Sequence, residues 1–100
     1  MRQAAKRDRN EGEIVAALRQ VGALVSRVSG HNLPDLIVGY RGKYLLLEVK
    51  EQAGKLTQGQ SKFHGEHLLR GLPCYVVRDV AEALESLGLE AQPGERRNDP

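Results

Sequence analysis

The chain has 100 residues, of which 40% are apolar and 28% charged, and its net charge is +2 at pH 7. This length fits one compact domain and leaves little room for a second. The single cysteine excludes an intrachain disulfide framework and a multi-cysteine zinc site, and no apolar run reaches the ~18 residues of a membrane span. The N-terminus also lacks the apolar core of a secretory signal. We therefore expect a cytoplasmic location and no membrane partner.

The first ten residues carry a local excess of three positive charges, because four basic side chains accompany only Asp8. The basic residues are Arg2, Lys6, Arg7 and Arg9. We expect residues 1–10 to form a basic, flexible arm that follows a phosphate backbone. A solvated chain terminus is the alternative interpretation of the same composition.

Apolar residues recur at helical spacing between residues 11 and 22, which predicts a helix over this range. Asn10 can cap the start of this helix, and Gly22 can end it. Residues 24–28 then alternate like a strand, and residues 29–32 form a turn-rich loop.

Residues 36–40 and 43–50 are β-rich runs, and the two residues between them, Arg41 and Gly42, are typical of a hairpin turn. The second run contains three consecutive leucines, which favours a central strand covered on both faces.

The last third of the domain predicts a helix, a strand and a second helix. Thr57 can cap a helix over residues 58–69, and residues 72–77 are typical of a strand. Asp79 can then cap a helix over residues 80–87.

These elements give the order α-β-β-β-α-β-α, which predicts an α/β fold with a mixed central sheet flanked by helices. We assign residues 11–89 to a single domain. Residues 90–100 are polar and contain Pro93, Gly94 and Pro100, so we expect a disordered tail.

Two acids and a lysine converge on the hairpin. With a two-residue turn, paired positions sum to 83, so Asp35 faces Glu48 with Cβ atoms ~5 Å apart. Like charges in that position are destabilising, and a divalent cation would remove the repulsion. Lys50 shares the face of Glu48 and can orient or deprotonate a water there. A bulged turn would place the acids on a diagonal instead, and a plain surface ion pair between Glu48 and Lys50 is the alternative without function.

This cluster resembles the motif of the PD-(D/E)XK nuclease superfamily. Pro34-Asp35 is followed, after twelve residues, by Glu48-Val49-Lys50. Residues 11–22 look like the first helix of archaeal Holliday junction resolvases and VRR-NUC nucleases. Three further blocks are similar to small phage-type VRR-NUC proteins: residues 33–39, 44–50 and 56–60.

The resemblance implies a restriction-endonuclease-like α-β-β-β-α-β core, Mg²⁺ or Mn²⁺ as the cofactor, and hydrolysis of DNA phosphodiesters by an activated water. Asp35 and Glu48 match the metal-binding acids, the carbonyl of Val49 matches the backbone ligand, and Lys50 matches the catalytic lysine. Stand-alone members of this size are similar to homodimeric junction resolvases, which implies branched DNA and a second copy as partners.

Two further positions match the family's site. Glu11 matches the acid of the first helix, as a metal ligand, and it extends the inward face formed by Ile14 and Val15. Glu13 projects sideways and remains the alternative, and either acid could simply complement the helix dipole. Gln60 matches a glutamine near the metal or scissile phosphate, and a polar residue on a helix surface is the alternative.

Five residues are candidates for DNA contact, although solvated charges and a plain turn would explain the same residues. They are Arg7, Arg9, Ser29, Lys55 and Lys62.

A zinc site is a weaker hypothesis. His64 and His67 share a helical face, but no acid or cysteine is placed to complete a ligand set. Cys74 lies in an apolar run, where we expect a small buried hydrophobic residue.

Together these features predict a divalent-metal-dependent DNA endonuclease that acts on branched DNA as a homodimer. It would recognise structure rather than sequence, because no separate module is available to read base edges. The alternatives are a non-catalytic DNA-binding or assembly module with the same fold, and a general or restriction-type nuclease.

Overall fold

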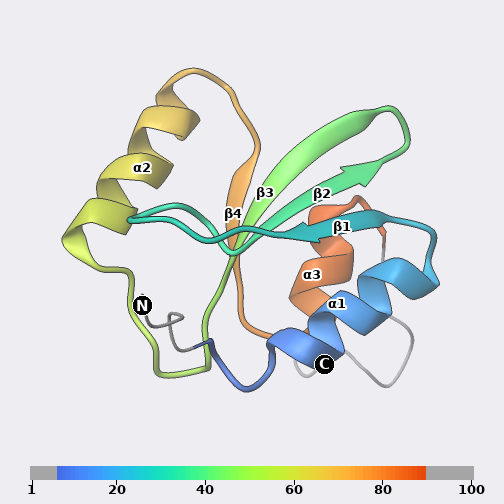
Figure 1. Ribbon diagram of the computed structural model, residues 1–100. Helices are drawn as coiled ribbons and strands as arrows, with labels where there is room; N and C mark the ends of the chain where they lie inside the picture. The colour runs from blue at the N-terminus through green and yellow to red at the C-terminus, as the bar shows by residue number, and fades with distance from the viewer. Residues whose placement is uncertain (1–6, 90–100) are drawn as a thin grey trace, which may run out of the picture.

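The computed structural model describes residues 7–89, so most of the expected N-terminal arm and the expected tail lie outside the described residues. Within this range, helices and strands follow the predicted order (Figure 1). They are α1 (Glu11–Gln20), β1 (Leu24–Arg27), β2 (Leu36–Tyr40), β3 (Lys43–Val49), α2 (Gln58–Leu69), β4 (Cys74–Val77) and α3 (Val80–Ser86). The strand expected from residue 72 starts two residues later, after Pro73, which has no N–H to donate to a strand ladder.

The four strands form one sheet in the order β1-β2-β3-β4. β1, β2 and β3 pair antiparallel, whereas β3 and β4 pair parallel and are joined through α2. Helices α1 and α3 pack together beneath one face of the sheet, and α2 lies on the other side, against β4 (Figure 1). The predicted α/β fold with a mixed, helix-flanked sheet is therefore confirmed.

The β2–β3 hairpin has the register that a two-residue turn requires. Arg41 and Gly42 have φ of 50° and 83°, both in the left-handed region that type I′ turns need. Leu36 pairs with Leu47 in the resulting ladder, so Asp35 stands one residue beyond, across from Glu48. The bulged alternative is wrong.

The core lies between the sheet and the α1–α3 layer. It is built by alternate residues of the two hairpin strands and by apolar residues of the helices, because period-2 and period-3.6 patterns bring one face of each element together. Its largest fully buried side chains are Ile14, Leu18, Leu36, Leu47, Val38, Val49 and Val77.

The opposite face of the sheet is less covered. β3 is central, as predicted, and Leu45 and Leu47 are buried, but Leu46 on the other face is only partly buried. α2 has no fully buried residue, and its Leu68 is 79% exposed. This incomplete cover leaves room for a site between α2 and the ends of β2 and β3.

Asn10 occupies the N-cap position of α1 but makes no side-chain cap hydrogen bond. Its Nδ2 instead donates to the carbonyls of Lys50 (3.1 Å) and Arg78 (2.9 Å). The expectation of a local cap is therefore wrong, since the side chain serves a longer-range contact. This contact fixes the start of α1 against the ends of β3 and β4.

Candidate active site

The candidate site lies where β2 begins and β3 ends, beside the start of α1 and the first turn of α2. A cavity of about 160 Å³ opens there, and the lining includes Asp35, Glu48, Lys50 and Gln60. The structure thus brings together, from three elements, four residues that the sequence singled out.

Asp35 and Glu48 are held in different ways. Asp35 Oδ2 accepts a hydrogen bond of 2.8 Å from the backbone N–H of Val49, which fixes its carboxylate at the end of β3. Glu48 is only 3% exposed, and its Oε2 accepts a 3.3 Å hydrogen bond from Gln60 Nε2. Its other oxygen, Oε1, is buried without a hydrogen-bond partner.

The electrostatics of this acid pair favour a bound cation. Burial raises the pKa of Glu48 to about 7, and the nearby Asp35 carboxylate adds to this effect. Burial also raises the pKa of Asp35, against the lowering effect of the Val49 N–H. Near neutral pH the pair therefore retains a proton unless a positive charge takes its place.

The residues present fit a hard divalent ion. Mg²⁺ and Mn²⁺ prefer carboxylate and carbonyl oxygens, and Glu48 Oε1 is an acceptor whose desolvation is uncompensated. Asp35 and Glu48 offer the carboxylates, and Val49 lies next to Glu48 with its N–H engaged by Asp35.

Lys50 stands beside this pair. Its Nζ is 3.7 Å from Glu48 Oε2, and its side chain is 15% exposed. An ammonium that is mostly buried next to a carboxylate has few positions available, so it can present a proton or orient a water toward the acids.

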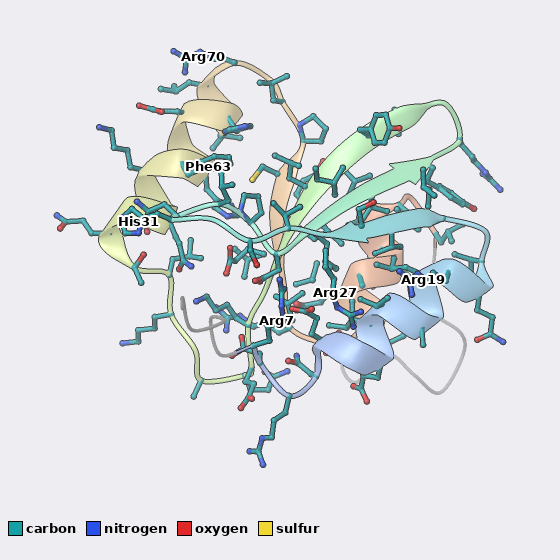
Figure 2. All side chains as sticks on the ribbon, viewed as in Figure 1. Arg7, Arg19, Arg27, His31, Phe63 and Arg70 are labelled. Carbon is teal, nitrogen blue, oxygen red and sulfur yellow. The ribbon has the colours of Figure 1, made fainter. Side chains whose placement is uncertain are left out.

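Glu11, rather than Glu13, is buried beside the site, although it is not among the residues that line the cavity. Glu13 is exposed, whereas Glu11 is 3% exposed and its carboxylate meets two arginines. Arg7 Nη1 lies 3.0 Å from Oε1, and Arg27 Nε lies 2.8 Å from Oε2. Figure 2 shows Arg7 and Arg27 close together beside the N-terminal end of α1.

The sequence placed Arg7 in a flexible DNA-binding arm and did not single out Arg27. In the structure Arg7 lines the same cavity as Asp35, Glu48 and Lys50. A signal for Arg27 was present: it is two residues from buried Val25 and pairs with Leu36, on the core face of β1. The Arg27 side chain is 44% exposed, and its Nε reaches the buried Glu11 carboxylate, which requires a charged partner.

Gln60 reaches Glu48 because its helix starts at a fixed place. Thr57 Oγ1 accepts from the Gln60 backbone N–H (3.1 Å), and Gln60 Oε1 accepts from the Thr57 N–H (2.9 Å). This capping box holds the glutamine while its Nε2 stays free for Glu48.

The other expected DNA contacts are more dispersed. Ser29 lines the cavity and its Oγ lies 3.3 Å from Arg7 Nη2. Arg9 is 91% exposed in its side chain and lies near Glu51. Lys55 and Lys62 are exposed and do not line the cavity that holds the two acids.

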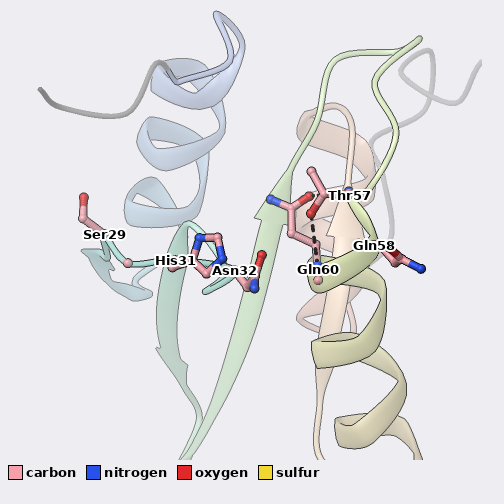
Figure 3. A pocket seen from close by; sticks show the side chains of 8 residues that line it. Ser29, His31, Asn32, Thr57, Gln58 and Gln60 are labelled. Atoms are coloured by element: carbon pink, nitrogen blue, oxygen red, sulfur yellow. Dashed lines mark hydrogen bonds between the residues drawn. The ribbon is translucent and has the colours of Figure 1, made fainter.

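A larger hollow of about 980 Å³ adjoins the cavity that holds the two acids (Figure 3). One wall is the loop with Ser29, His31 and Asn32, and the other is the first turn of α2. Gln60 and Ser29 line both spaces. A substrate strand could therefore pass from the hollow directly to the acids.

His64, His67 and Cys74 do not line the cavity that holds the two acids, whereas His31 lines the adjoining hollow. His64 Nδ1 is 3.5 Å from Cys74 Sγ, and His67 Nδ1 is 2.9 Å from the Phe63 carbonyl. Burial raises the pKa of the half-buried Cys74 to about 11, so its thiol stays protonated. Across residues 7–89, no three His, Cys, Asp or Glu side chains are grouped so as to hold a metal ion.

No protein-family model and no curated protein sequence matches this chain. A solved structure described as a VRR_NUC domain is similar to it, with a TM-score of 0.65 and 25% sequence identity. The match covers 79% of this chain and 95% of the other. The resemblance and the restriction-endonuclease-like fold are thereby confirmed, and the likeness supports a nuclease-type domain. Separately, no helix within residues 7–89 is long and apolar enough to cross a membrane.

Proposed function

We propose that this protein is a divalent-metal-dependent DNA endonuclease. The observation that carries the proposal is the acid pair: Glu48, buried with an unpartnered oxygen, faces Asp35 beside a mostly buried Lys50. A fold without catalytic function has no reason to keep this pair, because two adjacent carboxylates with raised pKa values destabilise it.

Asp35, Glu48 and the carbonyl of Val49 would hold the Mg²⁺ or Mn²⁺ ion. When bound, such an ion polarises a phosphate oxygen and makes a water more acidic. The chain's own residues orient these groups: the Val49 N–H fixes Asp35, and Gln60 fixes Glu48.

In the reaction, a water oxygen forms a bond to phosphorus while one phosphorus–oxygen ester bond breaks. The water gives up a proton, and the departing oxygen takes one up. Lys50 Nζ, 3.7 Å from Glu48 Oε2, is placed to orient the attacking water or to stabilise charge on the phosphate oxygens.

We further propose branched DNA as the substrate and a homodimer as the active form. The hollow between the 29–32 loop and α2 has a volume of about 980 Å³, and the exposed Lys55 and Lys62 are dispersed and do not line it. Such an arrangement can follow a backbone but offers no compact element to read base edges.

The test is cleavage of labelled four-way junction, flap, single-stranded and duplex DNA by the full chain, with Mg²⁺, Mn²⁺ or EDTA. We expect metal-dependent cutting that falls by about a hundredfold or more in Asp35→Asn and Glu48→Gln. Lys43→Ala is the matched control, because Lys43 is exposed at the far end of β3.

The products also separate the narrower alternatives. Paired, symmetric nicks on the junction support a resolvase, and equal cutting of every substrate supports a general nuclease. DNA binding without cutting under either metal would overturn the enzyme proposal in favour of a binding module.

A further inference from the structure

Both oxygens of Glu11 are already engaged by guanidinium groups. Arg7 Nη1 donates to Oε1 at 3.0 Å and to Oε2 at 3.1 Å. Arg27 Nε donates to Oε2 at 2.8 Å. Two guanidinium groups thus already offset the charge of Glu11, so a cation bound there would lie against two fixed positive charges, and Glu11 is only 3% exposed.

Arg7 is anchored at several points and lies between two acids. Its Nη2 donates to the Val28 carbonyl at 2.9 Å and to Ser29 Oγ at 3.3 Å. Its Nη1 also lies 3.7 Å from Asp35 Oδ1. The guanidinium therefore bridges Glu11 and Asp35, which places a fixed positive charge next to the proposed ion site.

Arg7 is partly exposed, and its side chain lines the proposed catalytic cavity. The side chain is 29% exposed and lines the same cavity as Asp35, Glu48 and Lys50. Nη1 and Nη2 donate the hydrogen bonds to Glu11, Val28 and Ser29, and a guanidinium carries a further donor, Nε–H, besides them. With its fixed positive charge, the group is suited to bind a phosphate.

One divalent ion is enough to offset the negative charge around the site. Four acids, Glu11, Asp35, Glu48 and the cavity-lining Asp8, stand with three bases, Arg7, Arg27 and Lys50. One divalent ion would make this cluster positive and suited to a phosphate, whereas a second would add repulsion against Arg7 and Arg27. Glu11 also forms no three-acid ligand group with Asp35 and Glu48 among residues 7–89.

We infer, on the basis of the proposed function, that the site takes one divalent ion, at Asp35 and Glu48, and that Arg7 supplies the second positive charge. Arg7 contacts the substrate phosphate. Glu11 is a positioning residue that holds Arg7 and not a metal ligand.

The first test counts the ions bound by the full chain in a Mn²⁺ titration. The electron paramagnetic resonance signal of free Mn²⁺ reports how much of the ion remains unbound. We expect one ion per wild-type chain. Glu11→Gln should still bind one Mn²⁺ ion, with a dissociation constant within about threefold of wild type, whereas Glu48→Gln should not bind the ion. Glu13→Gln, exposed in the same helical turn, is the matched control.

The second test measures the affinity for a DNA duplex in the presence of Ca²⁺, for the wild type and for Arg7→Met. The control variant is Arg41→Met, in the exposed hairpin turn. We expect Arg7→Met to weaken binding by about tenfold and to keep the ion count at one. Arg41→Met should bind like wild type. In turnover, Glu11→Gln should lower kcat/KM in the same direction as Arg7→Met, while leaving Mn²⁺ affinity unchanged.

Two Mn²⁺ ions per wild-type chain, or loss of an ion in Glu11→Gln, would overturn this inference and leave the proposed function intact. A second ion appearing in Arg7→Met would also overturn it, because Arg7 would then merely fill a metal position. A wild-type protein that binds no Mn²⁺ would contradict both this inference and the proposed function. Far-ultraviolet circular dichroism checks that each variant is folded, and the wild-type ion count depends on no variant.

Discussion

Glu48 has a raised pKa because it is buried and because Asp35 stands across the hairpin from it. Its two oxygens have unequal environments: Oε2 accepts from Gln60, and Oε1 has no partner. Protonation and cation binding both reduce the repulsion between the two buried carboxylates, so a proton and a cation compete for Glu48. The chemistry at this residue is therefore linked to pH.

The metal-free protein is expected to lose stability as pH rises. Glu48 has a folded-state pKa of about 7 against 4.5 in the unfolded chain, so the folded state binds more protons between these values. The associated stability is present below about pH 4.5 and is lost as pH rises through about 7. Melting in EDTA should show Tm falling by on the order of 10 °C between about pH 5 and pH 8.

Two comparisons check the cause of this slope. Glu48→Gln, which cannot titrate, should flatten the dependence of Tm on pH, and saturating Mg²⁺ should remove it in the wild type. A metal-free wild-type protein that became more stable over the same pH range would contradict the account.

Gln60 acts through Glu48. Gln60→Ala removes the Nε2 donor and half of the capping box, so we expect kcat to fall by about tenfold with little change in KM for DNA. Steady-state kinetics measures kcat and KM separately. Ser61→Ala, exposed in the same turn, is the control, and an unchanged kcat in Gln60→Ala would show that this hydrogen bond is not used.

At the scale of elements, local patterns predicted the hairpin and α2 well. Arg41 and Gly42 favour a two-residue turn, which alone determines that Asp35 and Glu48 face each other. Thr57 and Gln60 likewise determine where α2 starts. Both signals depend on residues close in sequence, and for this reason they could be found without the structure.

Asn10 shows where local patterns fail. An asparagine can cap a helix or hydrogen-bond to distant backbone, and the sequence does not show which carbonyls will be near. Here the carbonyls of Lys50 and Arg78, far along the chain, accept from Nδ2.

A substitution separates these two roles of Asn10. Asn10→Asp keeps a good N-cap residue but loses both N–H donors, so we expect a loss of roughly 1–2 kcal/mol in the free energy of unfolding. Urea denaturation measures this value. Stability equal to or above wild type would mean that a cap, and not the strand contact, is what Asn10 provides.

At the scale of the whole molecule, the site draws on segments that are far apart in sequence. The motif residues Asp35, Glu48 and Lys50 were predictable because one hairpin carries them. The grouping of Arg7, Arg27 and Glu11 was not, because it depends on how the segment before α1 crosses the end of β1. The hollow between the 29–32 loop and α2 likewise exists only in the folded chain.

Residues 7–89 of each chain contain one cluster of this kind, so we expect two opposed cuts on a junction to need two chains. We expect sedimentation equilibrium to give about twice the 11.0 kDa of the chain, with or without junction DNA. A mass of one chain under both conditions would remove the homodimer and paired nicking from the proposal. The hydrolytic chemistry of the single cluster would be unaffected.

The central claim is that Asp35, Glu48 and Lys50 together cut DNA with a divalent ion. The most direct measurement is the single-turnover cleavage rate of a labelled four-way junction as Mg²⁺ is increased, for wild type, Lys50→Ala and Lys43→Ala. We predict a saturable rise for wild type and Lys43→Ala, and a rate lower by about a hundredfold or more for Lys50→Ala. No cleavage by the wild type at any Mg²⁺ concentration, or wild-type rates in Lys50→Ala, would contradict it.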